Sequence, residues 1–158
     1  MVDFSGLLKK PAFKGVKPQA LPPAPAYPGR VGKFELGESK EKKTPYLRYQ
    51  IHITGWDESV SDQDRVFKDE EGVEHTIDPT KKTLRKDFWL TTGEGGKDGG
   101  YYQLDQFLRS IGVAGGPGVQ HEDVIGQAVG AMVIVSVGQF LNQQSGDILN
   151  EVKDVKGA

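Results

Sequence analysis

Residues 46–54 read YLRYQIHIT, and this stretch decides the fold class. Leucine, tyrosine or isoleucine stands at each odd-numbered position from 47 to 53, and a polar side chain follows each of them. Such strict alternation is typical of a β-strand with one buried and one exposed face. Pro45 comes directly before the stretch, and a strand tolerates proline at its first position. We therefore predict a strand over residues 46–54 whose odd-numbered side chains lie in the core.

Four further segments have strand character. They are residues 30–36 (RVGKFEL), 84–90 (LRKDFWL), 129–137 (VGAMVIVSV) and 148–155 (ILNEVKDV). Lys86 interrupts the apolar face of the second of these segments, which Leu84, Phe88 and Leu90 otherwise form. The turn-rich sequence NQQSGD at 142–147 predicts a hairpin between the last two strands.

A helix is predicted between the third and fourth strands. Apolar side chains at positions 101, 104, 107, 108 and 111 recur with the spacing of one helical face. Gly112 follows, where a glycine commonly ends a helix. Three strands, a helix and two strands is the element order of the OB-fold, a five-stranded Greek-key barrel that binds oligonucleotides and oligosaccharides. An SH3-like barrel and a small α+β sandwich have a similar strand count and remain alternatives.

The charge of the chain is unevenly distributed. The total is −2, but residues 1–54 carry a net charge of +6, whereas residues 55–80 carry −7. Six of the nine prolines fall between positions 11 and 28, and proline-rich segments favour extended structure. We therefore expect a basic, extended tail over residues 1–25, followed by one OB-fold domain over residues 26–158 with an acidic excursion at residues 57–80.

No segment of the sequence predicts a catalytic centre, a metal site or a cofactor. There is no cysteine, so disulfides and thiolate zinc sites are excluded. The glycine-rich segment 93–100 lacks the first glycine and the final serine or threonine of a phosphate-binding loop. The sequence has no apolar run long enough to span a membrane and no signal-peptide core. We therefore expect a cytoplasmic protein that is not an enzyme.

The polar face of the predicted sheet is suited to nucleic acid. This face combines the even-numbered side chains of strand 46–54 with the alternate side chains of strand 84–90. It brings together two aromatic rings, two arginines and a histidine: Tyr46, Trp89, Arg48, Arg85 and His52. Bases of a single strand stack on such rings, while the cations contact phosphates. Further phosphate contacts are predicted in the preceding loop and on the neighbouring strand: Lys40, Lys42, Lys43, Arg30 and Lys33. Taken singly, either ring is as well explained by packing at a strand edge or under the acidic excursion.

The segments YYQLDQFLRSIGV (101–113) and EDVIGQAVGAMVIVSV (122–137) together resemble bacteriophage-encoded OB-fold single-stranded-DNA-binding proteins. Residues 21–53 look like the first two strands of that family. The resemblance implies coating of single strands during phage replication or recombination in the host cytoplasm, with replication or recombination proteins as further partners. The chain departs from the family in its long acidic excursion and in the absence of an acidic C-terminal tail.

The sequence therefore predicts sequence-tolerant binding of single-stranded DNA. The alternative is an OB-fold module that uses the same face to bind a protein in an assembly or structural role. Self-association is a further expectation if strand 129–137 has an unpaired edge.

Overall fold

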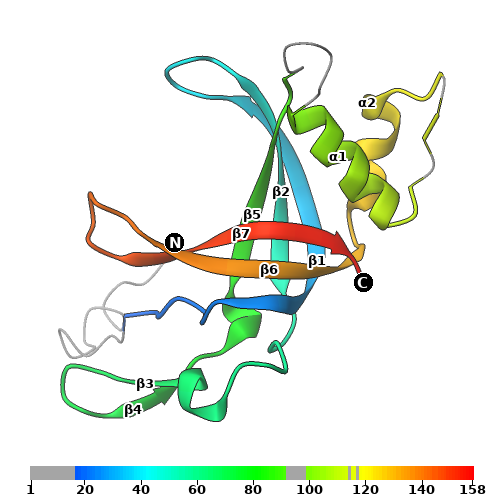
Figure 1. The fold of residues 1–158 in the computed structure, drawn as a ribbon. Helices are drawn as coiled ribbons and strands as arrows, with labels where there is room; N and C mark the ends of the chain where they lie inside the picture. The colour runs from blue at the N-terminus through cyan, green and yellow to red at the C-terminus, as the bar shows by residue number, and fades with distance from the viewer. Residues whose placement is uncertain (1–16, 92–98, 114, 117) are drawn as a thin grey trace, which may run out of the picture.

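Five long strands form one antiparallel sheet in the order β5-β2-β1-β6-β7 (Figure 1). The computed structural model describes the chain except for residues 1–16, 92–98, 114 and 117. The strands are β1 (Ala24–Glu38), β2 (Pro45–Ile53), β5 (Thr83–Trp89), β6 (Met132–Leu141) and β7 (Ile148–Gly157). The prediction of a mainly β protein is confirmed, and the bounds of β2 and β5 differ by one residue from those that the alternation predicts.

Strand β1 is the long central strand, and it is twice the expected length. Its first half pairs with β6 and its second half with β2. The register shifts between Ala24 and Tyr27 and again between Val31 and Phe34. Such bulges bend a strand, and they tolerate proline. Pro25 lies within the first bulge, which explains how the proline-rich segment enters the sheet.

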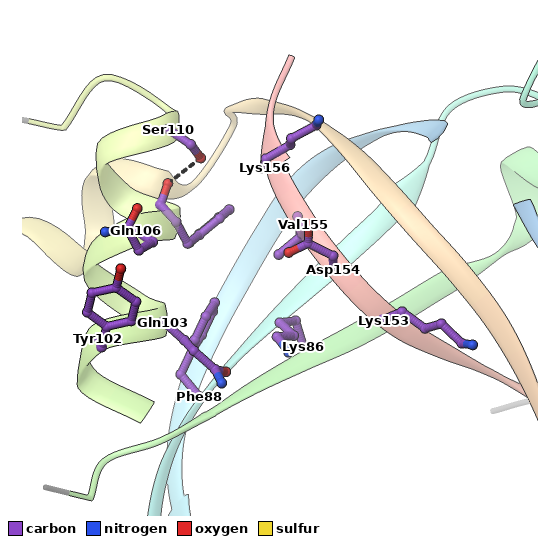
Figure 2. Close-up of a pocket in the computed structure, with 11 residues that line it drawn as sticks. Lys86, Phe88, Tyr102, Gln103, Gln106, Ser110, Lys153, Asp154, Val155 and Lys156 are labelled. Carbon is purple, nitrogen blue, oxygen red and sulfur yellow. Dashed lines mark hydrogen bonds between the residues drawn. The ribbon is translucent and has the colours of Figure 1, made fainter. Parts of the chain in front are cut away.

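The sheet is not closed into a barrel, contrary to the sequence-based expectation. Its edge strands β5 and β7 contact each other, but they form no ladder within the described residues. Instead β7 crosses β5 at a steep angle, and we call this place the β5–β7 crossing (Figure 2). Charged side chains stand along both edges, including Lys86 on β5 and Asp154 on β7. Charged residues on edge strands oppose edge-to-edge pairing, which is consistent with the open seam.

Two helices, α1 (Gly99–Ser110) and α2 (His121–Val124), lie between β5 and β6 and are followed by a 3-10 turn at Ile125–Ala128. Helix α1 buries Leu104, Phe107 and Leu108. It ends at Ser110, and Gly112 follows with a φ of 84°, the left-handed conformation that glycine adopts most readily. The four-residue α2 is too short to give a periodic sequence pattern. Strand β6 begins at Met132, later than predicted, because Val129 and Gly130 form a turn in which Gly130 has a φ of 90°.

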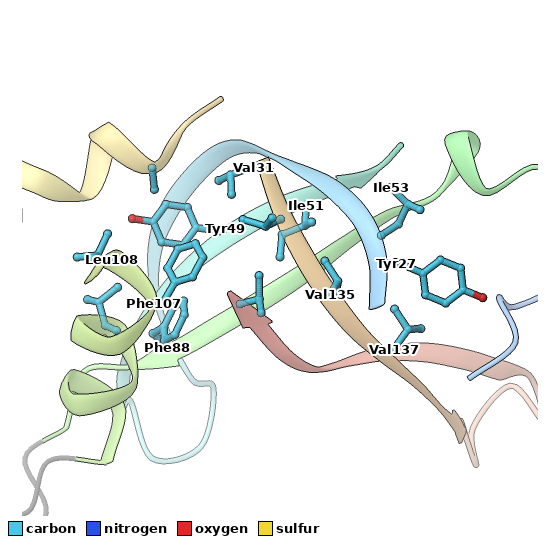
Figure 3. Close-up of a cluster of buried hydrophobic side chains, with 14 of the residues drawn as sticks. Tyr27, Val31, Tyr49, Ile51, Ile53, Phe88, Phe107, Leu108, Val135 and Val137 are labelled. Carbon is cyan, nitrogen blue, oxygen red and sulfur yellow. The ribbon is translucent and has the colours of Figure 1, made fainter. Parts of the chain in front are cut away.

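The core lines the inner side of the curved sheet, and Tyr49 of β2 lies at the end of it that α1 covers (Figure 3). The ring centroid of Tyr49 is 6.2 Å from that of Phe88 and 5.5 Å from that of Phe107. Its hydroxyl donates a 2.6 Å hydrogen bond to the carbonyl oxygen of Ile125. Tyr49 thus links β2, β5, α1 and the 3-10 turn. Burial raises its pKa above the ordinary value for tyrosine.

The acidic excursion is more regular than expected. It contains a short hairpin of β3 (Val66–Lys68) and β4 (Glu74–Thr76), flanked by 3-10 turns at Asp62–Arg65 and Pro79–Lys81. Asp57 anchors its start: this carboxylate is 4% exposed and accepts 2.7 Å hydrogen bonds from the backbone N–H groups of Ala26 and Ser59. At the hairpin, His75 hydrogen-bonds Asp69 at 2.8 Å.

The described chain begins at Lys17 and lies against the hairpin of β6 and β7. Lys17 forms an ion pair with Asp147. Leu21 is fully buried, and Asn150 hydrogen-bonds both its backbone N–H and its carbonyl oxygen. Residues 17–25 are therefore part of the folded domain rather than of a tail, whereas the rest of the expected tail falls outside the described residues. No helix in the described part of the chain is both long and apolar enough to cross a membrane.

Candidate nucleic-acid interface

The pairing of β2 with β5 brings the predicted site residues onto one surface. Opposite each other stand Tyr46 and Trp89, Arg48 and Asp87, Gln50 and Arg85, and His52 and Thr83. The intervening residues of β2 are buried in the core. We call the surface made by these eight side chains the β2–β5 outward face. Its four rungs span about 20 Å along the strands, at roughly 3.3 Å per residue.

Tyr46 and Trp89 form an edge-to-face aromatic pair at one end of this face. Their ring centroids are 5.5 Å apart with an interplanar angle of 75°, and Trp89 is 42% exposed. The Tyr46 ring crosses Gly37 on β1 so closely that a methyl group at position 37 would stand 2.5 Å from the Tyr46 hydroxyl oxygen. Gly37 therefore allows the ring to lie across β1, a role that the sequence alone does not reveal.

Arg48 is already occupied by a neighbouring acid. Its Nε and Nη2 donate hydrogen bonds of 2.6 and 3.0 Å to the two carboxylate oxygens of Asp87, and Glu35 lies 3.5 Å from Nη1. The hydrogen bond to Asp87 raises the pKa of Arg48 above its ordinary value. The guanidinium carbon lies 4.7 Å from the centroid of the Tyr46 ring. The predicted phosphate contact is thus a residue that fixes Tyr46, with its charge largely compensated.

The three lysines of the β1–β2 turn lie at the same end of the face as the aromatic pair. Lys40, Lys42 and Lys43 are all exposed. The turn is closed by hydrogen bonds between Ser39 and Thr44, and Lys43 adopts a φ of 50°. Glu38 and Pro45 are the last pair of the β1–β2 ladder before the turn, and Tyr46 is the next residue after Pro45. We call these three residues the lysine turn.

The remaining predicted cations lie farther along the sheet. Arg85 is exposed on β5, and Arg30 pairs with His52 at the far end of the outward face. Lys33 is exposed within the second bulge of β1, between Val31 and Phe34. The acidic excursion joins the far ends of β2 and β5, so the face runs from a basic turn to an acidic hairpin (Figure 1).

A groove continues the outward face around the edge of β5. It has a volume of about 880 Å³ and lies between β5 and the β6–β7 hairpin, and Arg85 and Asp87 belong to both surfaces. We call it the hairpin groove. Residues that the sequence did not single out also line it, among them Lys82, Phe140 and Leu149. Burial lowers the pKa of Lys82 below its ordinary value. The sequence signals for these residues are the lysine pair 81–82 and the apolar pairs on both sides of NQQSGD.

Comparisons with known proteins give no identification. No protein-family model matches the chain, and a search of curated proteins finds no match. Among the described residues no group of three or more His, Asp or Glu side chains is placed to hold a metal ion.

Proposed function

We propose that this chain is a single-stranded-DNA-binding protein of the OB-fold type, with the β2–β5 outward face as its binding surface. The observation that carries the proposal is the exposed Trp89 ring, which Tyr46 holds at the end of a face that also carries Arg85 and the lysine turn. An aromatic platform beside cations is the arrangement with which proteins bind single strands without reading their sequence.

The strand connectivity supports the OB-fold. The first long strand pairs with the second and fourth, the second with the third, and the fourth with the fifth. The OB-fold is a partly open Greek-key barrel, so the open seam between β5 and β7 is compatible with it. OB-folds bind oligonucleotides on the face of their second and third strands, between the loops that join strands one to two and four to five. In this chain those features are β2, β5, the lysine turn and the β6–β7 hairpin.

The face suggests a division of roles among its residues. Trp89 stacks on a base, at a gain of about 1–3 kcal/mol. Tyr46 and Arg48 hold the Trp89 ring in place through the aromatic and cation–π contacts. Arg85, Arg30, Lys33 and the lysine turn neutralise phosphates, and His52 donates or accepts a hydrogen bond. No bond is made or broken in this process, so neither a catalytic residue nor a cofactor is required.

The biological setting follows from the sequence resemblance. We infer a role in coating single strands during bacteriophage replication or recombination, in the cytoplasm of the host. Replication or recombination proteins are the partners that this role implies.

Tryptophan fluorescence tests the proposal directly. In a Trp56→Phe background the emission reports on Trp89 alone, and oligo-dT should quench it in a saturable way. Duplex DNA of the same length should bind more weakly, because its bases are not free to stack. The affinity should fall as salt is added. A plot of its logarithm against the logarithm of the salt concentration should have a slope of about −0.7 for each phosphate neutralised.

Trp89→Ala, in the otherwise natural chain, should weaken binding of oligo-dT by about 1–3 kcal/mol, as expected for loss of one stacked base. Trp56→Phe is the matched control, since Trp56 contacts Tyr27 and Arg65 away from the face and should leave affinity unchanged. A folded Trp89→Ala protein with the affinity of the natural chain would contradict the proposal.

The β6–β7 hairpin favours a second candidate, a protein-binding module. Its tip exposes four apolar side chains, which pair across the two strands: Phe140, Leu141, Ile148 and Leu149. The two pairs lie on successive rungs and so on opposite faces of the hairpin, and exposed apolar surface of this kind is typical of protein contacts. Association that is insensitive to salt, without quenching of Trp89 by oligo-dT, would favour this candidate over DNA binding.

A further inference from the structure

The β5–β7 crossing leaves a pocket on the side that faces α1 (Figure 2). The pocket has a volume of about 480 Å³, within the range of small-molecule sites. Side chains from three elements line it, including Lys86 and Phe88 of β5, Gln103 and Gln106 of α1, and Asp154 of β7. We call it the seam pocket. Lys86 and Phe88 alternate along β5 with Arg85, Asp87 and Trp89, so the pocket lies on the opposite side of β5 from the outward face.

Lys86 is the residue in this pocket that the fold does not explain. It stands opposite the fully buried Tyr49, at a position where the neighbouring rungs hold core side chains. Its ammonium nitrogen lies 5.5 Å from the centroid of the Phe88 ring. Within the part of the chain that the structure describes, Lys86 is itself partly buried and forms no ion pair.

Partial burial removes some of the hydration of the Lys86 ammonium group, and no carboxylate of the described residues lies within ion-pair distance to compensate for it. An apolar residue would serve the core better at this position. The open seam instead leaves the ammonium group of Lys86 beside a cavity, where an anion from outside can approach it. The lysine that interrupts the apolar pattern of the sequence is therefore suited to a ligand with a negative charge.

The other side chains of the pocket suit a planar ligand with hydrogen-bonding edges. The carboxamides of Gln103 and Gln106 supply both donors and acceptors, and the carboxylate of Asp154 accepts hydrogen bonds. Tyr102, which is 60% exposed, adds an aromatic ring from α1. Lys156 raises the positive charge near the pocket, although its side chain extends away from α1 in Figure 2. An anionic group joined to a planar base has this set of properties.

We propose that the seam pocket binds a nucleoside phosphate, with the phosphate against Lys86 and the base edge against Gln103, Gln106 and Asp154. The ligand is either a free nucleotide or the terminal nucleotide of a DNA strand. This site shares no residue with the outward face, although Lys86 also lines the hairpin groove. Mononucleotide binding in the seam pocket does not depend on single-strand binding on the outward face.

Calorimetric titration with thymidine 5′-monophosphate and deoxyadenosine 5′-monophosphate tests whether the pocket binds a free nucleotide. We expect saturable binding that falls about tenfold or more in Lys86→Met, which removes a charge-assisted hydrogen bond while keeping the aliphatic stem. Lys68→Met, on the exposed hairpin strand β3, is the matched control and should bind as the natural chain does. Gln103→Leu should also weaken mononucleotide binding while leaving the response to inorganic phosphate unchanged.

Titration with oligo-dT that carries or lacks a 5′-phosphate tests whether the pocket binds the terminal nucleotide of a DNA strand. A higher affinity for the phosphorylated strand that disappears in Lys86→Met assigns the pocket to the end of a strand. Equal affinities for the two oligonucleotides, together with mononucleotide binding that depends on Lys86, assign it to a free nucleotide. The proposal is overturned if neither mononucleotides nor the 5′-phosphate have an effect, or if Lys86→Met behaves as the natural chain. Trp89→Ala should retain mononucleotide binding, which separates this result from the test of the outward face.

Discussion

Asp87 and Arg48 are joined across the β2–β5 ladder by two hydrogen bonds, from Nε at 2.6 Å and from Nη2 at 3.0 Å. The paired guanidinium lies 4.7 Å from the centroid of the Tyr46 ring, and Tyr46 in turn contacts Trp89. An acid in the middle of the proposed DNA-binding face therefore has a structural purpose, because it fixes the cation that supports the aromatic pair. The same acid weakens the attraction of the face for phosphates.

Asp87→Asn should steepen the salt dependence of oligo-dT binding. The change removes a negative charge from the face and releases Arg48 for a phosphate, which should add about 0.7 to the magnitude of the log–log slope. Fluorescence titration at four salt concentrations measures this slope. Asp62→Asn, in the exposed 3-10 turn of the acidic excursion, is the control for general charge. An unchanged slope in Asp87→Asn would show that Arg48 does not reach a phosphate.

Gly37→Ala should weaken DNA binding without a change at any proposed contact residue. The added methyl group would stand 2.5 Å from the Tyr46 hydroxyl oxygen and 2.6 Å from its Cζ, so the ring must move away from its place beside Trp89. Near-ultraviolet circular dichroism reports the movement of the Tyr46 ring, and oligo-dT titration reports the loss of affinity. At Gly55 the nearest atom would be Pro28 Cγ at 3.5 Å, an ordinary contact, so Gly55→Ala should change neither signal. Natural affinity in Gly37→Ala would mean that the position of Tyr46 is not important for binding.

Tyr49→Phe should destabilise the fold by about 1–3 kcal/mol, because the carbonyl oxygen of Ile125 loses its 2.6 Å hydrogen bond in the core. Urea denaturation measures the loss. Tyr102→Phe is the control, since Tyr102 is 60% exposed on α1 and should leave the free energy of unfolding unchanged. Equal, small losses of stability in the two variants would show that the Tyr49 hydroxyl group is not a structural contact.

Asp57→Asn should reduce stability at neutral pH by about 1–3 kcal/mol and should flatten the decline in acid. Burial favours the neutral form of Asp57, but hydrogen bonds from Ser59 and Ala26 outweigh it and lower its pKa. A lowered pKa in the folded state means that the carboxylate contributes stability above its unfolded value of about 3.9, and that this contribution disappears as the pH falls through the folded value. Thermal unfolding at pH 7 and about pH 3 measures it. Glu58→Gln, at the exposed neighbouring position, should show the same acid dependence as the natural chain.

The sequence predicts those parts of the fold that depend on local periodicity. Strand β2 follows from alternation, and the end of α1 follows from Gly112. The first half of β1 is not predictable from alternation, because Pro25 and Pro28 argue against a strand; in the structure Pro25 lies in a bulge and Pro28 pairs in register with Ile134. The acidic excursion gave no apolar pattern because its order comes from polar contacts, such as those of Asp57 and Asp69.

The candidate site was only partly predictable for a similar reason. Alternation places Tyr46, Arg48, Arg85 and Trp89 on one surface, but only the register shows that Arg48 stands opposite Asp87. Lys82 and Phe140 line the hairpin groove together only because the curvature of the sheet brings β5 close to the β6–β7 hairpin. Lys86 was visible as an interruption, and only the open seam supplies a reason for it.

The lysine turn and the acidic hairpin lie at opposite ends of the same pair of strands, so the outward face is a dipole along its length. A flexible polyanion laid on it would be attracted more strongly at the lysine turn than at the end beside the acidic hairpin. In the proposed complex the strand would leave the face near Thr83, which also lines the hairpin groove. In the proposed complex the contacts with phosphates would be strongest near the lysine turn and weakest near the acidic hairpin, in whichever direction the strand runs.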